Sequence, residues 1–521
     1  MSSHSTGWCP QRGEGVLNGD TAVRARPIGE LADFVNSTEF DVIIVGGGGS
    51  GAAAAIEAIE RGASVIVLEK TSSLGGSTQE SGGSVRLIDD AHGAVEHYWT
   101  LTQGTTPRSV MEAFVDGLME LPDWIEAHGG ELVLVPNHNY TRWVFPARRP
   151  GTAFPHVPGA AGLGRRAHLA PMSPDRQRGA AMWDFLSRNL ARLDVPVFTG
   201  TRVIKLIEEG PSRAVVGVEV EIPDGTIQIR SKRGVILCCG GFAYDPEMIR
   251  QYFGIPLPAL SPPGRNAGDG IRMAQQVGAD LWHMSGASTT VGYKFPELDA
   301  GFHCRMPDYG FIMVDQNGKR YTSETHLENH AAHLIMITQD TITGEFTRIP
   351  SFVIFDEVTR KAGLLASLDS GENRHYPWSD DNMAEVEKGW ILKADTLEEI
   401  GELLGIPASE LRATIDDFNE CKDKAVADRL GRLPEQMRAL RDGPFYGVPV
   451  YPSFVNTQGG PRRNSEAAIL RPDGSLIPGL YGAGELGSIW NRLYPGAGNV
   501  SECLVFGRIA GRSAMSKRPE V

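Results

Sequence analysis

The chain has 521 residues and a formal net charge of −14 at pH 7. This length exceeds what one hydrophobic core supports and predicts two domains of unequal size. The negative charge argues against nucleic acid or an anionic membrane as a partner.

The first predicted unit runs from Asp41 to Glu69 and reads as strand, glycine turn, helix, strand and terminal acid. The apolar run from Val42 to Val45 predicts a buried parallel strand, and Ser64 to Leu68 predicts the next one. Between them the glycines follow the G-x-G-x-x-G spacing of a dinucleotide-binding turn; they are Gly46, Gly48 and Gly51. They allow a tight turn, close approach of backbone to a pyrophosphate, and close packing of helix on strand. Glu69 is placed to accept hydrogen bonds from a ribose hydroxyl.

The chain before and after this unit predicts an arm and a second domain. Residues 1–39 are rich in Gly, Ser, Arg and Pro, and we expect an arm that lies on the surface or is partly disordered, or that instead packs against a second subunit. Farther along, Phe311 to Asp315 predicts a strand that is followed by an Asn317-Gly318 hairpin turn. A helix is predicted around Thr396 to Leu404.

Features that are missing from the sequence limit the type of protein. No apolar run is long enough to span a bilayer, and the N-terminus lacks the apolar core of a signal peptide, so a cytoplasmic protein is expected. The six cysteines include no C-x-x-C pair and no cluster with metal-ligand spacing. Disulfides, zinc and iron–sulfur clusters are therefore not expected.

A glycine- and serine-rich loop directly follows Glu69 and resembles the flavin loop of the fumarate reductase and 3-ketosteroid dehydrogenase flavoprotein family, the FAD-binding-2 type. The resemblance implies that this loop wraps FAD from the ribityl chain to the isoalloxazine ring. Family members that tether FAD covalently carry a histidine in this loop, and residues 74–83 contain none. Non-covalent FAD is therefore expected.

Further motifs of the family follow in order, and the resemblance extends from about Phe40 to about Ser513. They are Arg202-Val203, Val235 to Phe242, Asn266 to Arg272, Gly479 to Glu485, and Gly498-Asn499 with a helix from Val500 to Ala510. Together with the first unit they imply an FAD-binding set: Gly46, Gly48, Gly49, Ser50, Gly51, Glu69, Lys70, Gly75, Gly76, Ser77, Thr78, Ser81, Gly82, Gly83, Val203, Gly240, Asp269, Gly484, Glu485, Gly498, Asn499 and Val500.

The resemblance implies an α/β fold in which a Rossmann-like FAD-binding domain carries an inserted α+β substrate-capping domain. Residues 40–290 and 441–521 would form the FAD-binding domain, because both parts carry cofactor motifs. Residues 291–440 would form the cap that closes over the flavin, with the substrate between cap and cofactor.

The segment Tyr494-Pro-Gly-Ala-Gly498 resembles the Y-P-G-x-G motif of 3-ketosteroid Δ1-dehydrogenases. In those enzymes the tyrosine hydroxyl and the N–H of the last glycine bind the ketone oxygen, and these roles transfer to Tyr494 and Gly498. Removal of hydrogens from neighbouring carbons needs such donors where enolate charge develops, and a base at the carbon.

The same region partly resembles the soluble fumarate reductases, since Arg492 lies in an N-R-L segment whose arginine binds a substrate carboxylate. Other residues of that subgroup are absent. Its carboxylate-binding histidine corresponds to Asn456, and its proton-delivering arginine corresponds to Glu328. Reduction of a dicarboxylate by the usual mechanism is therefore disfavoured.

The proton-abstracting tyrosine of the ketosteroid enzymes also aligns near Glu328, so the base is not identified by the motif. Glu328 could itself serve. Tyr140 lies in a region where the ketosteroid enzymes carry a second active-site tyrosine. The other candidates are Tyr309, Tyr321, His326 and His330.

The combined prediction is an FAD-dependent dehydrogenase or reductase that acts on a C–C bond next to a carbonyl, with a ketosteroid or similar cyclic ketone as substrate. Tyr494, Gly498, Arg492, Tyr140 and Glu328 are its candidate catalytic residues. One alternative is an enzyme for a small unsaturated or polycarboxylic acid, and another is a flavin-binding redox protein without turnover. There is no second G-x-G-x-x-G unit, so nicotinamide is not expected and the electron partner is not identified.

Overall fold

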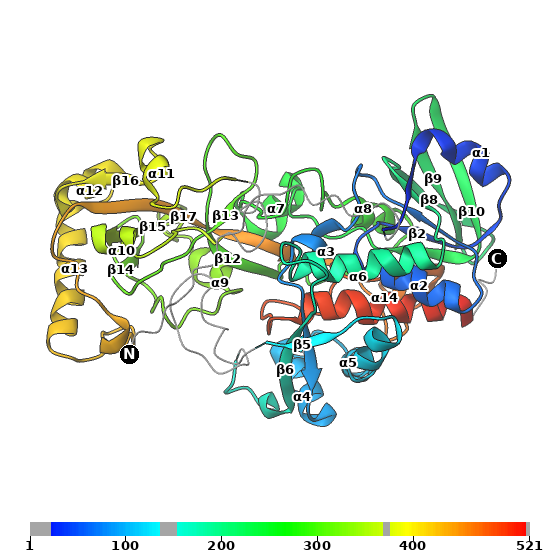
Figure 1. The fold of residues 1–521 in the computed structure, drawn as a ribbon, viewed down its shortest axis with the longest axis horizontal. Helices are drawn as coiled ribbons and strands as arrows, with labels where there is room; N and C mark the ends of the chain where they lie inside the picture. Colours follow the sequence, from blue (N-terminus) through cyan, green and yellow to red (C-terminus); the bar gives the residue numbers. More distant parts are fainter. Residues whose placement is uncertain (1–21, 136–153, 368–375, 517–521) are drawn as a thin grey trace.

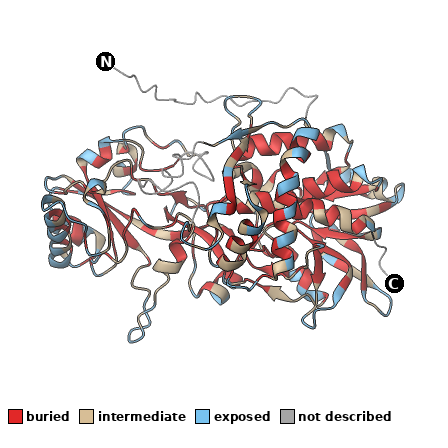
Figure 2. Ribbon diagram, turned by 90° about the horizontal axis from the view of Figure 1, so that it is seen from below, coloured by how far each residue is buried: buried red, intermediate tan, exposed pale blue. Residues whose placement is uncertain are grey.

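The computed structural model describes residues 22–135, 154–367 and 376–516. Two large β-sheets lie toward opposite ends of an elongated molecule, with helices packed on each (Figure 1). The strands of both sheets are mostly buried, and exposed residues gather on the outer faces of helices and on loops (Figure 2). Within the described ranges, no helix combines the length and the apolar character needed to cross a membrane.

The first sheet has nine strands and is parallel at its centre. There β2 (Phe40–Val45) lies between β3 (Val65–Leu68) and β10 (Gly225–Leu237). β2, β3 and the last residues of β10 are buried on both faces of the sheet, which accounts for their almost continuously apolar sequences. The sheet is completed by β1 (Ala25–Pro27), β7 (Val197–Thr199), β8 (Val203–Glu209), β9 (Ala214–Ile222), β19 (Ala468–Leu470) and β20 (Leu476–Gly482).

The described part of the predicted N-terminal arm belongs to this sheet. β1 pairs in parallel with β7, with Ala25 opposite Val197, and α1 (Leu31–Asn36) buries Leu31 in the core. Of residues 22–39 only Leu31 is buried, so the described part of the arm lies on the surface, but it also adds an edge strand that was not predicted. The segment is short and its apolar residues are few, so local patterning does not reveal a strand that depends on a distant partner for its hydrogen bonds.

Two helices that are far apart in sequence pack against each other beneath the first sheet. α2 (Gly49–Glu60) and α14 (Gly498–Ser516) lie side by side in Figure 1 and make extensive contact. Their approach depends on small residues, since a Cβ at Gly507 or Gly511 would lie 2.6 Å from a backbone oxygen of α2. The contact places Gly507, in the middle of α14, beside Ser50 at the start of α2 and thus close to the glycine turn.

The second sheet contains β12 (Ala287–Tyr293), β13 (Phe302–His303), β14 (Phe311–Val314), β15 (Ser351–Asp356), β16 (Leu392–Ala394) and β17 (Phe445–Thr457). β17 crosses the sheet and pairs with β12, β15 and β16. The sheet thus extends from Ala287 to Thr457, beyond both ends of the predicted capping segment 291–440. A single long strand carries the chain back toward the first sheet, so the two parts share no sharp boundary in sequence.

The Asn317-Gly318 turn forms, but it does not make the predicted hairpin. Gly318 has a φ of 74°, and the Asp315 N–H donates to the carbonyl of Lys319 at 2.9 Å. After the turn the chain leaves the sheet, and β14 pairs instead with β15, with Phe311 opposite Phe355. The turn residues set the local reversal, whereas the partner strand is chosen by burial of the apolar faces.

Helices cover one side of the second sheet. The predicted helix is α12 (Leu397–Leu404), with Thr396 as N-cap in a capping box with Glu399. Together with α13 (Ala408–Asp423) it packs apolar side chains on β14 and β15. Shorter helices of this part are α9 (Ala332–Met336), α10 (Glu357–Lys361) and α11 (Met383–Glu387).

The remaining elements surround the first sheet. A small sheet joins β4 (Ser84–Ile88), β5 (Leu132–Leu134) and β6 (Leu163–Leu169), and β11 (Leu281–Trp282) pairs with β18 (Gly460–Pro461). The helices are α3 (Gly76–Glu80), α4 (Ala91–Leu101), α5 (Arg108–Ala127), α6 (Gly179–Arg192), α7 (Pro246–Phe253) and α8 (Asp269–Gln276).

Candidate active site

The turn between β2 and α2 is built from glycines, and at two of them the surrounding backbone leaves no room for a side chain. Gly46 has a φ of 111°, and a Cβ there would lie 2.3 Å from the carbonyl oxygen of Cys238. A Cβ at Gly51 would lie 2.0 Å from the carbonyl oxygen of Gly46. Gly48 has no such neighbour nearer than 4.0 Å and lines an open cavity. The turn therefore exposes backbone and the start of a helix to that cavity.

Glu69 follows β3 and is bound to the same turn. Its Oε2 accepts a hydrogen bond from the Gly47 N–H at 2.8 Å, and its Oε1 accepts from the N–H and the hydroxyl of Thr71, both at 2.8 Å. These donors fix the carboxylate at the edge of the cavity, where its remaining lone pairs can accept from a ribose hydroxyl.

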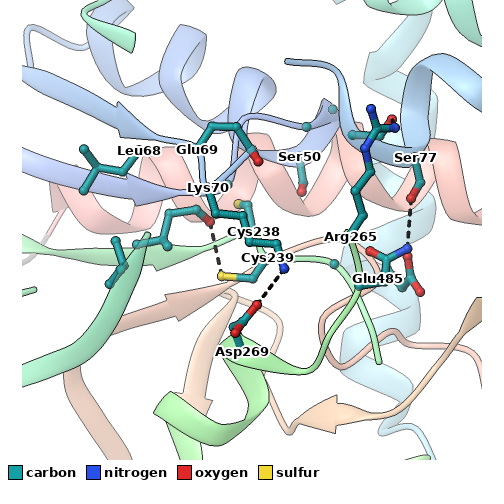
Figure 3. Close-up of a pocket in the computed structure, with 18 of the residues that line it drawn as sticks. Ser50, Leu68, Glu69, Lys70, Ser77, Cys238, Cys239, Arg265, Asp269 and Glu485 are labelled. Atoms are coloured by element: carbon teal, nitrogen blue, oxygen red, sulfur yellow. Dashed lines mark hydrogen bonds and ion pairs between the residues drawn. The ribbon is translucent and has the colours of Figure 1, made fainter. Parts of the chain in front are cut away.

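The cavity runs along the carboxyl ends of β2, β3 and β10. Figure 3 shows Leu68 and Glu69 on one side of it, Ser77 and Glu485 on the other, and Ser50 between them. The predicted cofactor residues that line it are Gly46, Gly48, Gly49, Ser50, Glu69, Lys70, Gly76, Ser77, Thr78, Val203, Gly240, Asp269 and Glu485.

Charged groups cross-link one wall of this cavity. Asp269 Oδ2 lies 2.7 Å from Lys70 Nζ, and its Oδ1 lies 3.1 Å from Arg202 Nη2. Burial opposes ionisation of Asp269, but the two cations hold the pKa of its carboxyl below the usual value. Arg265 also lines the cavity and donates to the carbonyl of Gly76 at 3.1 Å. Arg265 is not among the predicted cofactor residues, although it directly precedes the Asn266 motif.

A second cavity continues from the first, because Ser77, Thr78, Glu485 and Cys503 line both. The predicted residues in its wall are Ser77, Thr78, Ser81, Gly82, Gly83, Glu485, Tyr494, Asn499 and Val500. The predicted glycines at positions 51, 75, 484 and 498 lie in neither wall and instead shape the adjoining turns and the helix contact.

Tyr494 joins the second cavity to the start of α14. Its hydroxyl oxygen accepts hydrogen bonds from the N–H groups of Gly498 at 2.9 Å and Asn499 at 3.0 Å. The side chain is only 6% exposed. The hydroxyl thus receives two of the backbone donors that a helix start leaves without helical partners. The structure brings Tyr494 and Gly498 together, with Tyr494 in the cavity wall.

Glu485 lies where the two cavities meet. Its Oε1 accepts from the backbone N–H of Thr457 at 3.0 Å and from the Thr457 hydroxyl at 3.2 Å. Burial raises the pKa of Glu485 to about 7, and the hydrogen bonds from Thr457 oppose this shift only in part. The carboxyl group therefore changes protonation near neutral pH.

This shift predicts a pH dependence of stability in the FAD-depleted protein. Between the ordinary carboxyl pKa of 4.5 and the raised value of about 7, the folded protein holds a proton on Glu485 that the unfolded chain releases. The resulting contribution is fully present below the lower value and is lost as pH rises through the higher one, by on the order of 1–3 kcal/mol. Glu485→Gln should remove this loss in melting curves recorded from pH 5 to 8.

The exposed Glu402 in α12 offers a matched control, since Glu402→Gln removes a carboxyl that water already solvates. It should leave the pH dependence of the melting temperature as in the unsubstituted protein. If Glu485→Gln gave the same pH profile as Glu402→Gln, the raised pKa of Glu485 would be refuted.

Asn456 and Asn499 form the junction between β17 and α14 in the second cavity. Asn499 Nδ2 donates to Asn456 Oδ1 at 2.6 Å, and Asn456 Nδ2 donates to the carbonyl of Thr457 at 2.8 Å. Within the described residues, the buried Asn499 Oδ1 has no hydrogen-bond partner. An acceptor of this kind fits the ring of a flavin, which presents an N–H donor between two carbonyls.

Two of the candidate bases lie together beside this cavity. Glu328 Oε2 accepts from the backbone N–H of His330 at 2.6 Å, and Glu328 Oε1 lies 3.2 Å from His330 Nδ1. His330 lines the second cavity, and its ring meets the ring of Tyr494 edge-on at a centroid distance of 4.9 Å. Glu328 is 8% exposed and stands behind His330.

The other candidates lie elsewhere. Tyr321 is held by the hydroxyl of Ser351 at 2.7 Å, and burial raises the pKa of its phenol. Tyr309 is half-buried and His326 is exposed, and neither lines the cavity. Arg492 is exposed and lies outside both cavity walls. Tyr140 is outside the described residues.

Comparison with known proteins gives three findings. The model of a family described as FAD binding domain matches residues 41–501. A 3-oxosteroid 1-dehydrogenase of Mycobacterium tuberculosis (strain CDC 1551 / Oshkosh) is 28% identical over 92% of this chain and 98% of its own. An NADH:acrylate oxidoreductase of Vibrio harveyi is also 28% identical, over 91% of this chain and 50% of its own.

A solved structure has a similar fold. It is a 3-ketosteroid delta1-dehydrogenase from Sterolibacterium denitrificans in complex with 1,4-androstadiene-3,17-dione. Its TM-score is 0.77 with 22% sequence identity, and the match covers 92% of this chain and 100% of that one. This likeness confirms the predicted mixed α/β class.

Proposed function

Because this chain belongs to the FAD-binding domain family, and FAD is therefore its cofactor, we propose that it is an oxidoreductase that adds or removes hydrogens across a C–C bond next to a carbonyl. The substrate class is a 3-ketosteroid or a similar bulky cyclic ketone. The relative named above as a 3-oxosteroid 1-dehydrogenase supports this class, as does a second relative of that name from another strain of Mycobacterium tuberculosis, and each matches over nearly its whole length.

The walls of the first cavity fit FAD. The glycine turn and the start of α2 would hold the pyrophosphate, Glu69 would bind the adenosine ribose, and Glu485 would bind the ribityl chain. The flavin ring would then lie beside Asn499 at the start of α14. The first sheet would be the Rossmann-like FAD-binding part, and the second sheet with its helices would be the inserted cap. When bound, FAD supplies the hydride acceptor or donor.

The observation that carries the proposal is the position of Tyr494 in the wall of the second cavity. Its hydroxyl oxygen accepts from the N–H groups of Gly498 and Asn499, and these two bonds make the hydroxyl proton a stronger donor. A ketone oxygen placed there would accept that proton, and negative charge that develops on it during enolisation would be stabilised. The ionisable side chains in the wall of the second cavity are those of Glu80, Arg166, Glu485, His303 and His330. The rest of the wall is uncharged and suits an apolar ring system.

The alternative substrate is a small unsaturated or polycarboxylic acid. This alternative is supported by the NADH:acrylate oxidoreductase relative and by two relatives named fumarate reductase (cytochrome). Binding of a carboxylate by Arg492 would require an exposed side chain, outside both cavity walls, to reach the flavin. The cyclic ketone therefore fits the described cavity better than the acid. The non-enzymatic alternative is a flavin-binding protein without turnover. The two cavities are continuous, so a substrate in the second could reach a flavin in the first, and this argues against that alternative.

Anaerobic mixing of the FAD-loaded protein with a panel of saturated and unsaturated 3-ketosteroids tests the proposal. We expect the visible absorbance of oxidised flavin to bleach as hydrogen leaves the substrate, with the matching unsaturated ketone as product by mass spectrometry. If the flavin does not bleach, the dithionite-reduced protein is mixed anaerobically with enones and unsaturated acids. Reoxidation by acids alone would replace the ketosteroid assignment with the acid alternative.

A further inference from the structure

We propose that His330 is the catalytic residue that accepts the proton in this reaction, and that Glu328 is the positioning residue that holds it. The inference rests on the proposed function and identifies the proton acceptor that the sequence motif leaves open. It is carried by the contact of these two side chains with each other and by the contact of His330 with Tyr494.

The position of His330 meets the geometric requirement for such a base. The carbon that loses the proton is bonded to the carbonyl carbon, so the acceptor must lie near the group that binds the carbonyl oxygen. His330 lines the same cavity as Tyr494, and their rings meet edge-on at 4.9 Å. A ketone oxygen at the Tyr494 hydroxyl would place the neighbouring carbon within reach of the imidazole.

The contact with Glu328 selects the tautomer. His330 Nδ1 lies 3.2 Å from Glu328 Oε1, so in the neutral imidazole Nδ1 carries the hydrogen and donates it to the carboxylate. Nε2 is then the basic nitrogen. A carboxylate on the far side of the ring also stabilises the imidazolium that forms when Nε2 takes a proton, as in other carboxylate–histidine pairs.

The proton-transfer step balances as an acid–base reaction. The C–H bond next to the ketone breaks, its electron pair moves into the new C=C bond of the enolate, and the carbonyl oxygen gains the negative charge. The proton passes to Nε2 of His330. In the reverse direction the imidazolium returns a proton to the same carbon.

The backbone around this pair is held by several contacts, so the side chains are preorganised. The Thr289 N–H of β12 donates to the carbonyl of His330 at 3.0 Å, and the Ala331 N–H donates to the carbonyl of Glu328 at 3.1 Å. Just upstream, buried Arg320 pairs with Glu324 at 2.6 Å and anchors the start of the segment. Such support is what a catalytic side chain needs to keep its orientation.

The test measures enolisation separately from flavin reduction. The dithionite-reduced, FAD-loaded protein is incubated with a 3-ketosteroid in D₂O, and deuterium at the carbon next to the ketone is measured by mass spectrometry after subtraction of the uncatalysed rate. Reduced flavin accepts no hydride, so exchange reports the base alone. The variants are His330→Ala, His330→Gln, Glu328→Gln and Glu328→Asp, with His326→Ala as the matched control on the exposed side of the same segment.

We expect the rate of deuterium exchange to fall by about 10²–10⁴-fold in both His330 variants. Added imidazole should restore part of the rate in His330→Ala. The rate in His326→Ala should stay within about twofold of wild type. Glu328→Gln should lower kcat with KM little changed, and Glu328→Asp should recover part of that loss, whereas a merely structural role would give neither result. FAD content and melting temperature identify variants that fail to fold, and His330→Gln preserves side-chain volume better than His330→Ala.

The outcomes separate the inference from the function. If wild-type protein bleaches with ketosteroids and His330→Gln exchanges at the wild-type rate, the inference is overturned and the proposed function stands. If wild-type protein neither bleaches nor exchanges with any ketosteroid, the proposed function is overturned and the inference falls with it.

Discussion

Tyr494→Phe should lower the rate of flavin reduction by a ketosteroid by about 10²–10³-fold, which is the usual effect of removing one donor to a developing oxyanion. The hydroxyl accepts from two backbone N–H groups at 2.9 and 3.0 Å, and these polarise it as a donor. Phenylalanine keeps the ring and its edge-on contact with His330. The loss should therefore fall on the chemical step and leave the flavin spectrum unchanged.

The same substitution should also destabilise the protein modestly. Without the hydroxyl, the N–H groups of Gly498 and Asn499 lose their acceptor, at a cost of about 1–3 kcal/mol for a buried unsatisfied group. Stopped-flow absorbance measures the reduction rate, and thermal melting of the FAD-loaded protein measures the stability. The two readouts distinguish a lost donor from a lost fold.

Tyr481→Phe is the matched control for this experiment. Tyr481 lies on β20, and its hydroxyl donates to the carbonyl of Ser513 near the other end of α14 at 3.4 Å. Its removal should leave flavin reduction unchanged. An unchanged reduction rate in Tyr494→Phe, with an unchanged flavin spectrum, would exclude Tyr494 from the chemistry.

Arg463→Met should destabilise the protein by about 3–5 kcal/mol, because it leaves the carboxylate of Glu502 buried without its cation. The two side chains form an ion pair and are 0% and 1% exposed. Burial raises the pKa of Glu502 and lowers the pKa of Arg463 in spite of their attraction, so each ion depends on the other. The melting temperature should fall by on the order of 10 °C.

The pair also positions the candidate site. Glu502 accepts from the N–H of Ile489 at 2.9 Å and from the hydroxyl of Ser488 at 2.6 Å, and Arg463 donates to the carbonyl of Leu486 at 3.1 Å. These bonds attach the segment that carries Glu485 and Tyr494 to α14. Arg463→Met should therefore also reduce the FAD content of the purified protein.

The double variant Arg463→Met/Glu502→Leu tests whether an unpaired buried charge causes the loss of stability. Removing both charges leaves no unpaired ion, so the double variant should be more stable than Arg463→Met alone. Arg441→Met, which breaks an exposed pair with Asp423, should change the melting temperature little. A double variant no more stable than Arg463→Met would contradict the explanation by an unpaired buried charge.

Local patterns predicted the βαβ unit and α12 well. The apolar run of β2, the glycine spacing and the second apolar run of β3 are contiguous in sequence, so each element carries its own signal. For α12, Thr396 and Glu399 form a capping box that the sequence shows directly. In these cases the interactions that define the element lie within a few residues of each other.

The sequence by itself therefore determined the glycine turn, the family and most of the motifs that line the two cavities, because short-range spacing encodes them. Only the tertiary structure decided that β1 joins β7, that β14 pairs with β15 instead of forming a hairpin, and that the end of β17 reaches Glu485 and the second cavity. It also decided that His330, held by Glu328, meets Tyr494, more than a hundred residues away. Such contacts depend on how buried faces and long strands pack in three dimensions, and no local pattern in the chain specifies that packing.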